Sequence, residues 1–410
     1  MLLEFVAQNV YSYKEEIYFS MEAVKRTALK NEFTHIREHR ILKSAIIFGA
    51  NASGKSNVLN AINTLKQLIV KPDNASLPFP SYAGNKSEPI SFQITLRKDD
   101  RVYKYSVAYL KTKITHEKLE IESRNKWETY FERNEKEYIS YPKEFEIFKT
   151  KTRQDNLFLN TLKTFDDEPS LAVYRWFVRD LLILGAQWGM DQEAFKRLND
   201  NKSKEKVLNF VRAADINIED IEVFEQQIKI PDEIRSLFEG VNSQLNFKVP
   251  ETETRLRISH KQYDEDGRRL DNFVLDFTQE SLGTQKLLSL ALIILLNTDR
   301  VILIDEFDNS LHNELARAML EVFNCQENSN QFILTSHELS LMDSDFKREQ
   351  IYFVERNSRG ISNLYSAYDF ETSANRKDYS YLKRYKAGQF GAIPVVLVDA
   401  LKESLKKARV

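Results

Sequence analysis

The sequence predicts an α/β fold with a mostly parallel sheet, an antiparallel hairpin subdomain and a helical insertion. Three observations lead to this prediction. Apolar runs at residues 45–49 and 301–304 indicate buried strands, helix-like and strand-like patterns alternate after residue 270, and residues 88–122 have the pattern of an antiparallel pair. Strands that alternate with helices favour parallel pairing, with helices on both faces of the sheet.

The N-terminal part of the chain combines a strand, a glycine-containing turn and a helix. Apolar and polar residues partly alternate in the first 25 residues, which predicts an opening strand. The run "AIIFG" predicts a buried strand, and apolar residues then recur every three or four positions from Val58 to Ile69. This period predicts an amphipathic helix that ends before Pro72.

We expect three segments along the chain, because 410 residues exceed one ordinary core. Residues 1–122 hold the first half of the α/β unit and the hairpin, and residues 123–270 form a mainly helical inserted subdomain that is rich in charge. Residues 271–410 complete the unit with the strand at 301–304, further helices, a strand at 331–334 and a C-terminal tail.

The composition excludes several classes of protein. The net charge is −2 with 29% charged residues, so both signs are mixed and no global basic field indicates nucleic acid. The single cysteine, Cys325, excludes a disulfide framework and a four-thiolate zinc site, and it favours a reducing compartment.

The sequence predicts a cytoplasmic protein that does not enter a membrane. The N-terminus lacks the basic start and sustained apolar run of a signal peptide. The longest apolar run, at residues 287–296, is shorter than the roughly 20 residues of a membrane-spanning helix. We interpret it as a buried helix.

The turn after the first buried strand matches a phosphate-binding pattern. Gly49 to Ser56 fit G-x-x-x-x-G-K-[ST] between a predicted strand and a predicted helix, which is the context that this motif requires. Backbone N–H groups and the helix N-terminus attract phosphate in such a turn. We expect Lys55 to contact the β- and γ-phosphates and the Ser56 hydroxyl to bind Mg²⁺. The residues expected to contact the nucleotide here are Gly49, Asn51, Ala52, Ser53, Gly54, Lys55, Ser56 and Asn57.

Two carboxylates follow the apolar run at 301–304. Asp305 and Glu306 should lie at the C-terminal edge of a buried strand, where ligands bind in open α/β sheets. We expect Asp305 to hold Mg²⁺ together with Ser56, through its hydration shell. Glu306 is expected to accept a proton from the attacking water, or to orient that water.

Together these motifs resemble the ATP-binding-cassette superfamily, in the branch of the SMC and RecF proteins. "ESLGTQKLLSLAL" resembles the signature motif of that branch, with Ser281, Gly283 and Gln285 at the matching positions. Leu282 stands where the family also has a small or polar residue. The resemblance implies that Ser281 and Gly283 bind the γ-phosphate of an ATP held by a second protomer.

Two later segments resemble further parts of the cassette. "DNSLH" resembles the dimer-contacting loop, which is led by Asp308, and "QFILTSHE" places His337 where the family has a histidine that senses the γ-phosphate. The resemblance thus implies that ATP and Mg²⁺ are the cofactors and that the catalytic set is Lys55, Glu306 and His337.

Other parts of the sequence bear on which nucleotide binds and on which residue completes the Mg²⁺ coordination. The base-reading Asn-Lys-x-Asp motif of small GTPases is absent, which favours ATP over GTP. The glutamine that completes Mg²⁺ coordination in cassettes has two candidates here, Gln154 and Asn156.

Read over nearly its whole length, the chain resembles bacterial AAA/ABC-type ATPases of the overcoming-lysogenisation-defect and abortive-infection kind, which act in anti-phage defence. The resemblance is carried by the segments "NVYSYKEEIYFSM", "FGANASGKSNVLNAI", "NLFLNTL", "ESLGTQKLLSLA", "VILIDEFDNSLH", "QFILTSHE", "QIYFVER" and "YLKRYKAGQFGAIPVV". It implies a RecF-like head that dimerises head to tail around two ATP molecules. It also implies a separately encoded effector, such as a nuclease or toxin, because residues 338–410 are too few for an appended nuclease domain.

Three functions remain open at this stage. The first is an ATPase that dimerises around ATP and regulates a partner effector. The second is a DNA-binding repair ATPase related to SMC and RecF proteins, which the basic clusters "KRYK" at 383–386 and "KESLKKAR" at 402–409 permit. The third is a slow-turnover, ATP-dependent scaffold that holds an effector inactive. In all three, higher assemblies are built from head-to-tail dimers.

Overall fold

The chain forms two compact units in a computed structural model. The structure describes residues 1–23, 33–36, 39–71, 75–185, 192–214, 217–227, 252–344, 346–370, 380–391, 402 and 404. The first unit takes residues 1–186, 299–309 and 316–410, and the second takes residues 187–298 and 310–315. These borders differ from the three segments expected from the sequence, because strands continue past residue 122 in the first unit and a small sheet accompanies the helices of the second.

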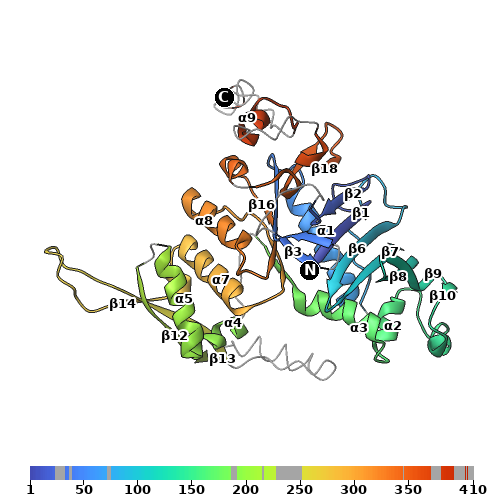
Figure 1. Ribbon diagram of the computed structural model, residues 1–410, viewed down its shortest axis with the longest axis horizontal. Coiled ribbons are helices and arrows are strands. Elements are labelled where there is room, and N and C mark those ends of the chain that lie inside the picture. The colour runs from blue at the N-terminus through green and yellow to red at the C-terminus, as the bar shows by residue number, and fades with distance from the viewer. Residues whose placement is uncertain are drawn as a thin grey trace. The chain divides into compact units, whose positions relative to one another are not determined.

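A mostly parallel sheet carries the strand ends that matter for function (Figure 1). Its order is β11-β15-β16-β5-β17-β18, in which the first five strands pair in parallel and β18 runs antiparallel to β17. The strands are β5 (Ser44–Gly49), β11 (Leu181–Leu184), β15 (Val301–Ile304), β16 (Gln331–Thr335), β17 (Ile351–Arg356) and β18 (Ser362–Ser366). Every residue of β5, β15 and β16 is buried, which explains why these strands consist largely of apolar residues.

The second sheet of the first unit is antiparallel, in the order β10-β9-β8-β7-β6-β1-β2 (Figure 1). Its strands are β1 (Leu2–Gln8), β2 (Ile17–Ser20), β6 (Ile90–Lys98), β7 (Arg101–Leu110), β8 (Lys113–Ser123), β9 (Lys126–Asn134) and β10 (Glu137–Ser140). The hairpin predicted at residues 88–122 is confirmed by the pairing of β6 with β7. A separate pair is formed by β3 (Phe33–Ile36) and β4 (His39–Leu42). The predicted fold class is thus confirmed.

One continuous core joins the two sheets of the first unit through α1. The α-helices that contribute residues to this unit are α1 (Lys55–Val70), α2 (Phe158–Lys163), α3 (Glu168–Arg175), α8 (Asn313–Asn324) and α9 (Tyr381–Lys386). Gln331 is fully buried between the sheets, where its Oε1 accepts from the backbone N–H of Leu2 at 2.8 Å and its Nε2 donates to the Leu2 carbonyl at 2.9 Å. Because both ends of this buried amide are paired, Gln331 fixes the start of β1 beside β16 of the other sheet.

The second unit contains helices and a three-stranded sheet. Its elements are α4 (Gln192–Lys196), α5 (Asn201–Ala213), β12 (Ile218–Gln227), β13 (Thr252–His260), β14 (Phe273–Asp276) and α7 (Leu282–Leu296). The apolar run at 287–296 lies in α7 and its residues 287–292 are buried, so the prediction of a helix is confirmed. His260 of β13 and Glu280 lie 2.6 Å apart (Nε2 to Oε1), which ties the sheet to the segment before α7.

A buried carboxylate holds α2 against the antiparallel sheet. Glu117 of β8 is fully buried and accepts from the backbone N–H groups of Phe158 and Leu159 at 2.8 and 2.9 Å. It also pairs with the Arg133 guanidinium at 2.7 Å and accepts from the Tyr105 hydroxyl at 3.0 Å. The carboxylate therefore satisfies donors from two strands and the first turn of a helix.

Glu117→Gln should destabilise the chain by about 3–5 kcal/mol, because it leaves the Arg133 guanidinium buried without a counter-charge. Urea unfolding of the full chain measures this loss. Glu135→Gln is the matched control, since that carboxylate is half exposed and pairs with Lys113 at the surface, where a pair contributes less than about 1 kcal/mol. Equal unfolding midpoints for the two variants would contradict the role assigned to Glu117.

Candidate functional site

Two glycines delimit the turn between β5 and α1 because other chains pass too close for a side chain. At Gly49 a Cβ atom would lie 2.4 Å from the carbonyl oxygen of Val354, on the neighbouring strand β17. At Gly54, where φ is +115°, a Cβ atom would lie 2.7 Å from the Oγ of Ser362. The turn is therefore held against β17 and β18 by contacts that only glycine permits.

Lys55 lies inside this turn rather than on the surface. Its side chain is 5% exposed, and its Nζ donates to the carbonyl oxygens of Gly49 and Ala50 at 2.8 and 3.1 Å. The Nδ1 of His337 lies 3.2 Å from the same Nζ. Burial lowers the pKa of Lys55 from 10.5 to about 8, against the opposing effect of nearby carboxylates. An ammonium that forms no ion pair with any described carboxylate is suited to receive phosphate.

One carboxylate oxygen joins the ends of three neighbouring structural elements. The Oδ1 of Asp305 accepts from the Ser56 hydroxyl at 3.0 Å and from the Thr335 hydroxyl at 2.5 Å. The Thr335 hydroxyl in turn accepts from the backbone N–H of Glu306 at 2.8 Å. Ser56 and Asp305 thus meet as predicted, although their roles toward a metal stay predictions.

The donors at this point fit Mg²⁺. A hydroxyl and a carboxylate are hard oxygen ligands, and Mg²⁺ in nucleotide sites takes few protein ligands and completes its shell with phosphate and water. In the part of the chain that the structure describes, no group of three or more His, Cys, Asp or Glu side chains could hold a metal by itself. The two oxygen ligands of Ser56 and Asp305 suit a metal that also binds phosphate and water.

Glu306 is placed by a backbone conformation that is unusual for its residue type. Its φ is +49°, in the left-handed region, which costs of order 1–3 kcal/mol for a residue with a side chain. Its Oε1 lies 3.7 Å from the Nε2 of His337, and its Oε2 accepts from the Asn309 side chain at 3.3 Å. Such strain clusters at functional sites, where the surrounding structure maintains it.

These groups line one cavity of about 450 Å³. The cavity is bounded by residues 51–57 of the turn, together with Glu306, His337 and Arg356. Its size falls within the range of small-molecule sites. The structure therefore brings turn residues 51–57, Glu306 and His337 to one cavity within the first unit, whereas Gly49 and Asp305 do not line it.

Asp308 makes backbone contacts within the chain. Its carboxylate accepts from the N–H groups of His337 and Glu338, at 3.2 Å and 3.0 Å for the shorter contact to each. It therefore positions the segment that carries the imidazole. The predicted contact of Asp308 with nucleotide across a dimer stays a prediction.

The signature segment starts a helix in the second unit. Ser281 is the N-cap of α7, and its hydroxyl accepts from the backbone N–H of Thr284 at 3.1 Å. At Gly283 a Cβ atom would lie 2.7 Å from the carbonyl oxygen of Ser310, so the close approach requires glycine. Gln285 donates to the Glu280 carbonyl at 2.8 Å. Ser281 and Leu282 are exposed, the latter by 68%.

The two candidates for the missing metal-ligating glutamine do not line the cavity. The carbonyl of Gln154 accepts from the backbone N–H of Ile114, and the carbonyl of Asn156 accepts from the Arg133 guanidinium at 2.6 Å. Their main chains thus attach this segment to the antiparallel sheet.

Arg356 is the cavity residue that sequence reasoning missed. It ends β17, donates to the Gly360 carbonyl at 3.1 Å, and reaches the Ala52 carbonyl at 3.4 Å. The available signal was a cation two positions after the apolar run "IYFV", because parallel strands that end at one sheet edge place such residues together. A guanidinium beside the turn adds a second positive group for phosphate.

The family model described as "AAA domain, putative AbiEii toxin, Type IV TA system" matches residues 44–343. No curated protein matches the sequence. No helix in the described part of the chain is long and apolar enough to cross a membrane.

Solved structures of SMC heads are similar at low identity. The SMC head domain from Thermotoga maritima shares 13% identity, covers 90% of this chain and 99% of its own, and has a TM-score of 0.39. An SMC head bound to the C-terminal winged-helix domain of ScpA has 12% identity, 89% and 97% coverage and a TM-score of 0.39. An Smc head with an extended coiled coil, bound to the C-terminal domain of ScpA and derived from Pyrococcus furiosus, has 12% identity, 89% and 96% coverage and a TM-score of 0.40.

Thr335→Val should weaken both the fold and the site, because one hydroxyl serves Asp305 and the Glu306 N–H at once. Leaving a buried donor unpaired costs about 1–3 kcal/mol, which urea unfolding would measure. Thr95→Val is the matched control, since that buried hydroxyl makes one weak bond to Glu4 at 3.3 Å. A loss for Thr335→Val no larger than that for Thr95→Val would contradict the joining role of Thr335.

Proposed function

Because the chain belongs to the family described as "AAA domain, putative AbiEii toxin, Type IV TA system", we propose that it binds and hydrolyses ATP, dimerises around it and regulates a partner effector in anti-phage defence. The observation that carries the proposal is the convergence of the glycine turn, the Ser56–Asp305 pair and the Glu306–His337 pair on one cavity. The turn is 249 residues from Asp305 (counted from Ser56) and 282 residues from His337 (counted from Lys55). Together these groups supply the parts that phosphoryl transfer to water requires.

Each residue has a definite task in this proposal. Lys55 exchanges its bonds to the Gly49 and Ala50 carbonyls for bonds to phosphate oxygens, and Arg356 adds a second cation beside the turn. Ser56 and Asp305 hold Mg²⁺, which supplies neutralisation of phosphate charge. Glu306 takes the proton of the attacking water, and His337, held through its backbone by Asp308, lies beside both Lys55 and Glu306.

The exposed signature segment supports a second copy as the missing half of the site. Ser281 and Leu282 lie at the N-terminal end of a 15-residue helix, where free N–H groups favour an anion. We infer that Ser281 and Gly283 of one protomer meet the γ-phosphate held by Lys55 of the other. Loss of the γ-phosphate on hydrolysis then weakens the dimer, which makes the nucleotide state a conformational signal.

A DNA-binding repair ATPase is the competing function. Among described residues, the last turn of α9 carries Lys383, Arg384 and Lys386, but cations in that place also complement the helix C-terminus. The second basic cluster, at 402–409, lies mostly outside the described residues. Salt-dependent binding of plain duplex DNA would favour this function over effector regulation.

Glu306→Gln should lower ATP turnover by about 10²–10⁴-fold, because the amide cannot accept the water proton. It should retain ATP and accumulate as a dimer. Steady-state hydrolysis and sedimentation with and without ATP and Mg²⁺ measure these effects. Glu321→Gln, an exposed position on α8, is the control and should behave as the unmodified chain. Unchanged turnover in Glu306→Gln would remove Glu306 from this role.

A second variant separates nucleotide binding from dimerisation. Ser281→Arg places a long cation at the exposed N-cap, so it should abolish the ATP-dependent dimer and turnover while the monomer still binds ATP. Ser281→Thr keeps a capping hydroxyl and should retain the dimer. An intact dimer in Ser281→Arg would contradict the shared site and leave ATP binding itself unaffected.

The regulatory part of the proposal predicts a stable partner. The product of a neighbouring gene should co-purify with this chain at fixed stoichiometry and be released when ATP and Mg²⁺ are added or removed. The Glu306→Gln variant should retain ATP, so it should keep the chain and its partner in the arrangement of the ATP-bound state. The genomic neighbour is co-expressed in this test. Recovery of the chain alone under every nucleotide condition would contradict regulation of an effector and favour an ATPase that acts without a partner.

A further inference from the structure

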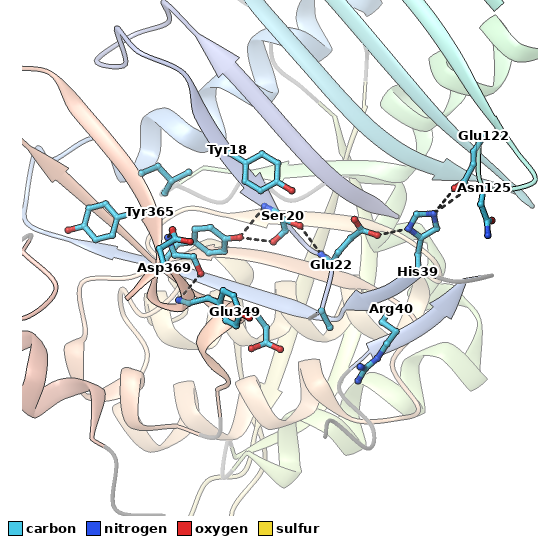
Figure 2. A pocket seen from close by; sticks show the side chains of 15 residues that line it. Tyr18, Ser20, Glu22, His39, Arg40, Glu122, Asn125, Glu349, Tyr365 and Asp369 are labelled. Atoms are coloured by element: carbon cyan, nitrogen blue, oxygen red, sulfur yellow. Dashed lines mark hydrogen bonds and ion pairs between the residues drawn. The ribbon is translucent and has the colours of Figure 1, made fainter. Parts of the chain in front are cut away.

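A second cavity of about 560 Å³ lies in the first unit, and it shares no lining residue with the nucleotide cavity. Figure 2 shows its walls, which come from β2, β4 and the end of β8 on one side and from the β17–β18 hairpin on the other. Two short 3₁₀ segments, η6 (Arg348–Gln350) and η7 (Ala367–Asp369), complete it. We call it the acidic pocket, because four carboxylates line it: Glu22, Glu122, Glu349 and Asp369.

Three of the four carboxylates already have partners. Glu22 and Glu122 lie on either side of the His39 ring, at 2.5 Å from its Nδ1 and 3.2 Å from its Nε2 (Figure 2). Burial lowers the pKa of His39, but the hydrogen bonds to these two carboxylates outweigh burial and raise the pKa above 6.5. Asp369 accepts from the backbone N–H of Ser366 at 2.9 Å.

Glu349 is different from the other three. Its side chain lines the pocket and the residue is only 6% exposed. Its Oε1 is fully buried and has no hydrogen-bond partner among the residues that the structure describes. A buried carboxylate oxygen without a donor costs several kcal/mol unless a cation or donor meets it. The Glu349 carboxylate therefore adds to the pocket wall a negative charge that no described residue pairs, and a ligand with N–H donors would offset this charge.

Tyrosine rings form the remaining walls. Tyr18 and Tyr368 are exposed by 51% and 42%, and Tyr365 of β18 also lines the pocket. The Arg348 guanidinium already lies over the Tyr368 ring at 5.1 Å, so this ring accepts a cation on one side. Aromatic faces next to carboxylates are the surroundings in which a planar guanidinium binds best, because it stacks and donates two hydrogen bonds at once.

We propose that the acidic pocket binds a guanidinium group, which donates to Glu349 and stacks on the tyrosine wall. Arg40 also lines the pocket, so among the described lining residues four carboxylates face two cationic groups, Arg40 and His39. This excess of negative charge favours a cationic ligand. The group comes either from a free small molecule or from an arginine side chain of a partner polypeptide. The proposal does not depend on ATP hydrolysis.

Calorimetric titration of the full chain, without nucleotide and at low salt, tests the proposal with N-acetylarginine amide as the probe. N-acetylcitrulline amide is the control ligand, because it has nearly the same shape without the charge. The arginine compound should bind at least tenfold more tightly, and Glu349→Gln should remove that difference. Glu321→Gln, outside the pocket, should keep it. No binding of the arginine compound, or equal binding of both compounds, overturns the proposal.

Acetyl-Ala-Arg-Ala amide distinguishes the two sources of the group. Tighter binding of this peptide than of the single amino acid supports a partner polypeptide, and equal or weaker binding supports a free small molecule.

Tyr368→Ala is the second variant and should weaken binding of the arginine compound several-fold through loss of stacking. Melting temperatures check folding, and Glu349→Gln should melt no lower than the unmodified chain because it removes an unpaired buried charge. ATP turnover of Glu349→Gln should be unchanged, so failure of this proposal is distinguishable from failure of the ATPase proposal.

Discussion

The shared oxygen of Asp305 is the contact on which the arrangement of the cavity beside residues 51–57 depends. The hydroxyls of Ser56, at the start of α1, and of Thr335, at the end of β16, both donate to this oxygen. The Thr335 hydroxyl also accepts a hydrogen bond from the backbone N–H of Glu306. Three elements are thereby held by one carboxylate and two hydroxyls at the edge of the parallel sheet. Because hydrogen bonds to a charged acceptor are stronger than neutral ones, these short contacts can hold Glu306 in its left-handed conformation.

The β17–β18 hairpin connects this edge to the acidic pocket. At one end, Val354 and Ser362 approach Gly49 and Gly54 so closely that no side chain fits. At the other end, Tyr352 exchanges hydrogen bonds with the backbone of Ser20 at 3.0 and 2.9 Å, and Tyr365 lines the pocket. The same pair of strands therefore contacts both cavities. A ligand that moved the hairpin at the pocket would act on the glycine turn through packed backbone rather than through flexible side chains.

Three groups in the two cavities each depart from an ordinary rule of folding. Lys55 has a pKa lowered to about 8 because it is buried against carbonyl oxygens, and Glu306 has a positive φ. Glu349 has a buried oxygen without a donor. Elsewhere the same chain satisfies buried charge well, as at Glu117, where two backbone N–H groups, a guanidinium and a hydroxyl converge. Local rules are broken where a ligand is expected to complete the structure.

The sequence by itself determined the elements whose signal is local. The glycine spacing and the flanking apolar periods identified the turn and α1, and the runs "AIIFG" and "VILI" identified buried strands, because strands covered on both faces must be apolar throughout. Only the tertiary structure decided that residues 126–140 extend the antiparallel sheet, since pairing partners distant along the chain decide strand formation there. It also decided that Arg356 joins the cavity beside residues 51–57, and that Glu349 lines a second pocket with one oxygen that no described residue pairs. These placements depend on which strand ends meet in space, and no short stretch of sequence contains that information.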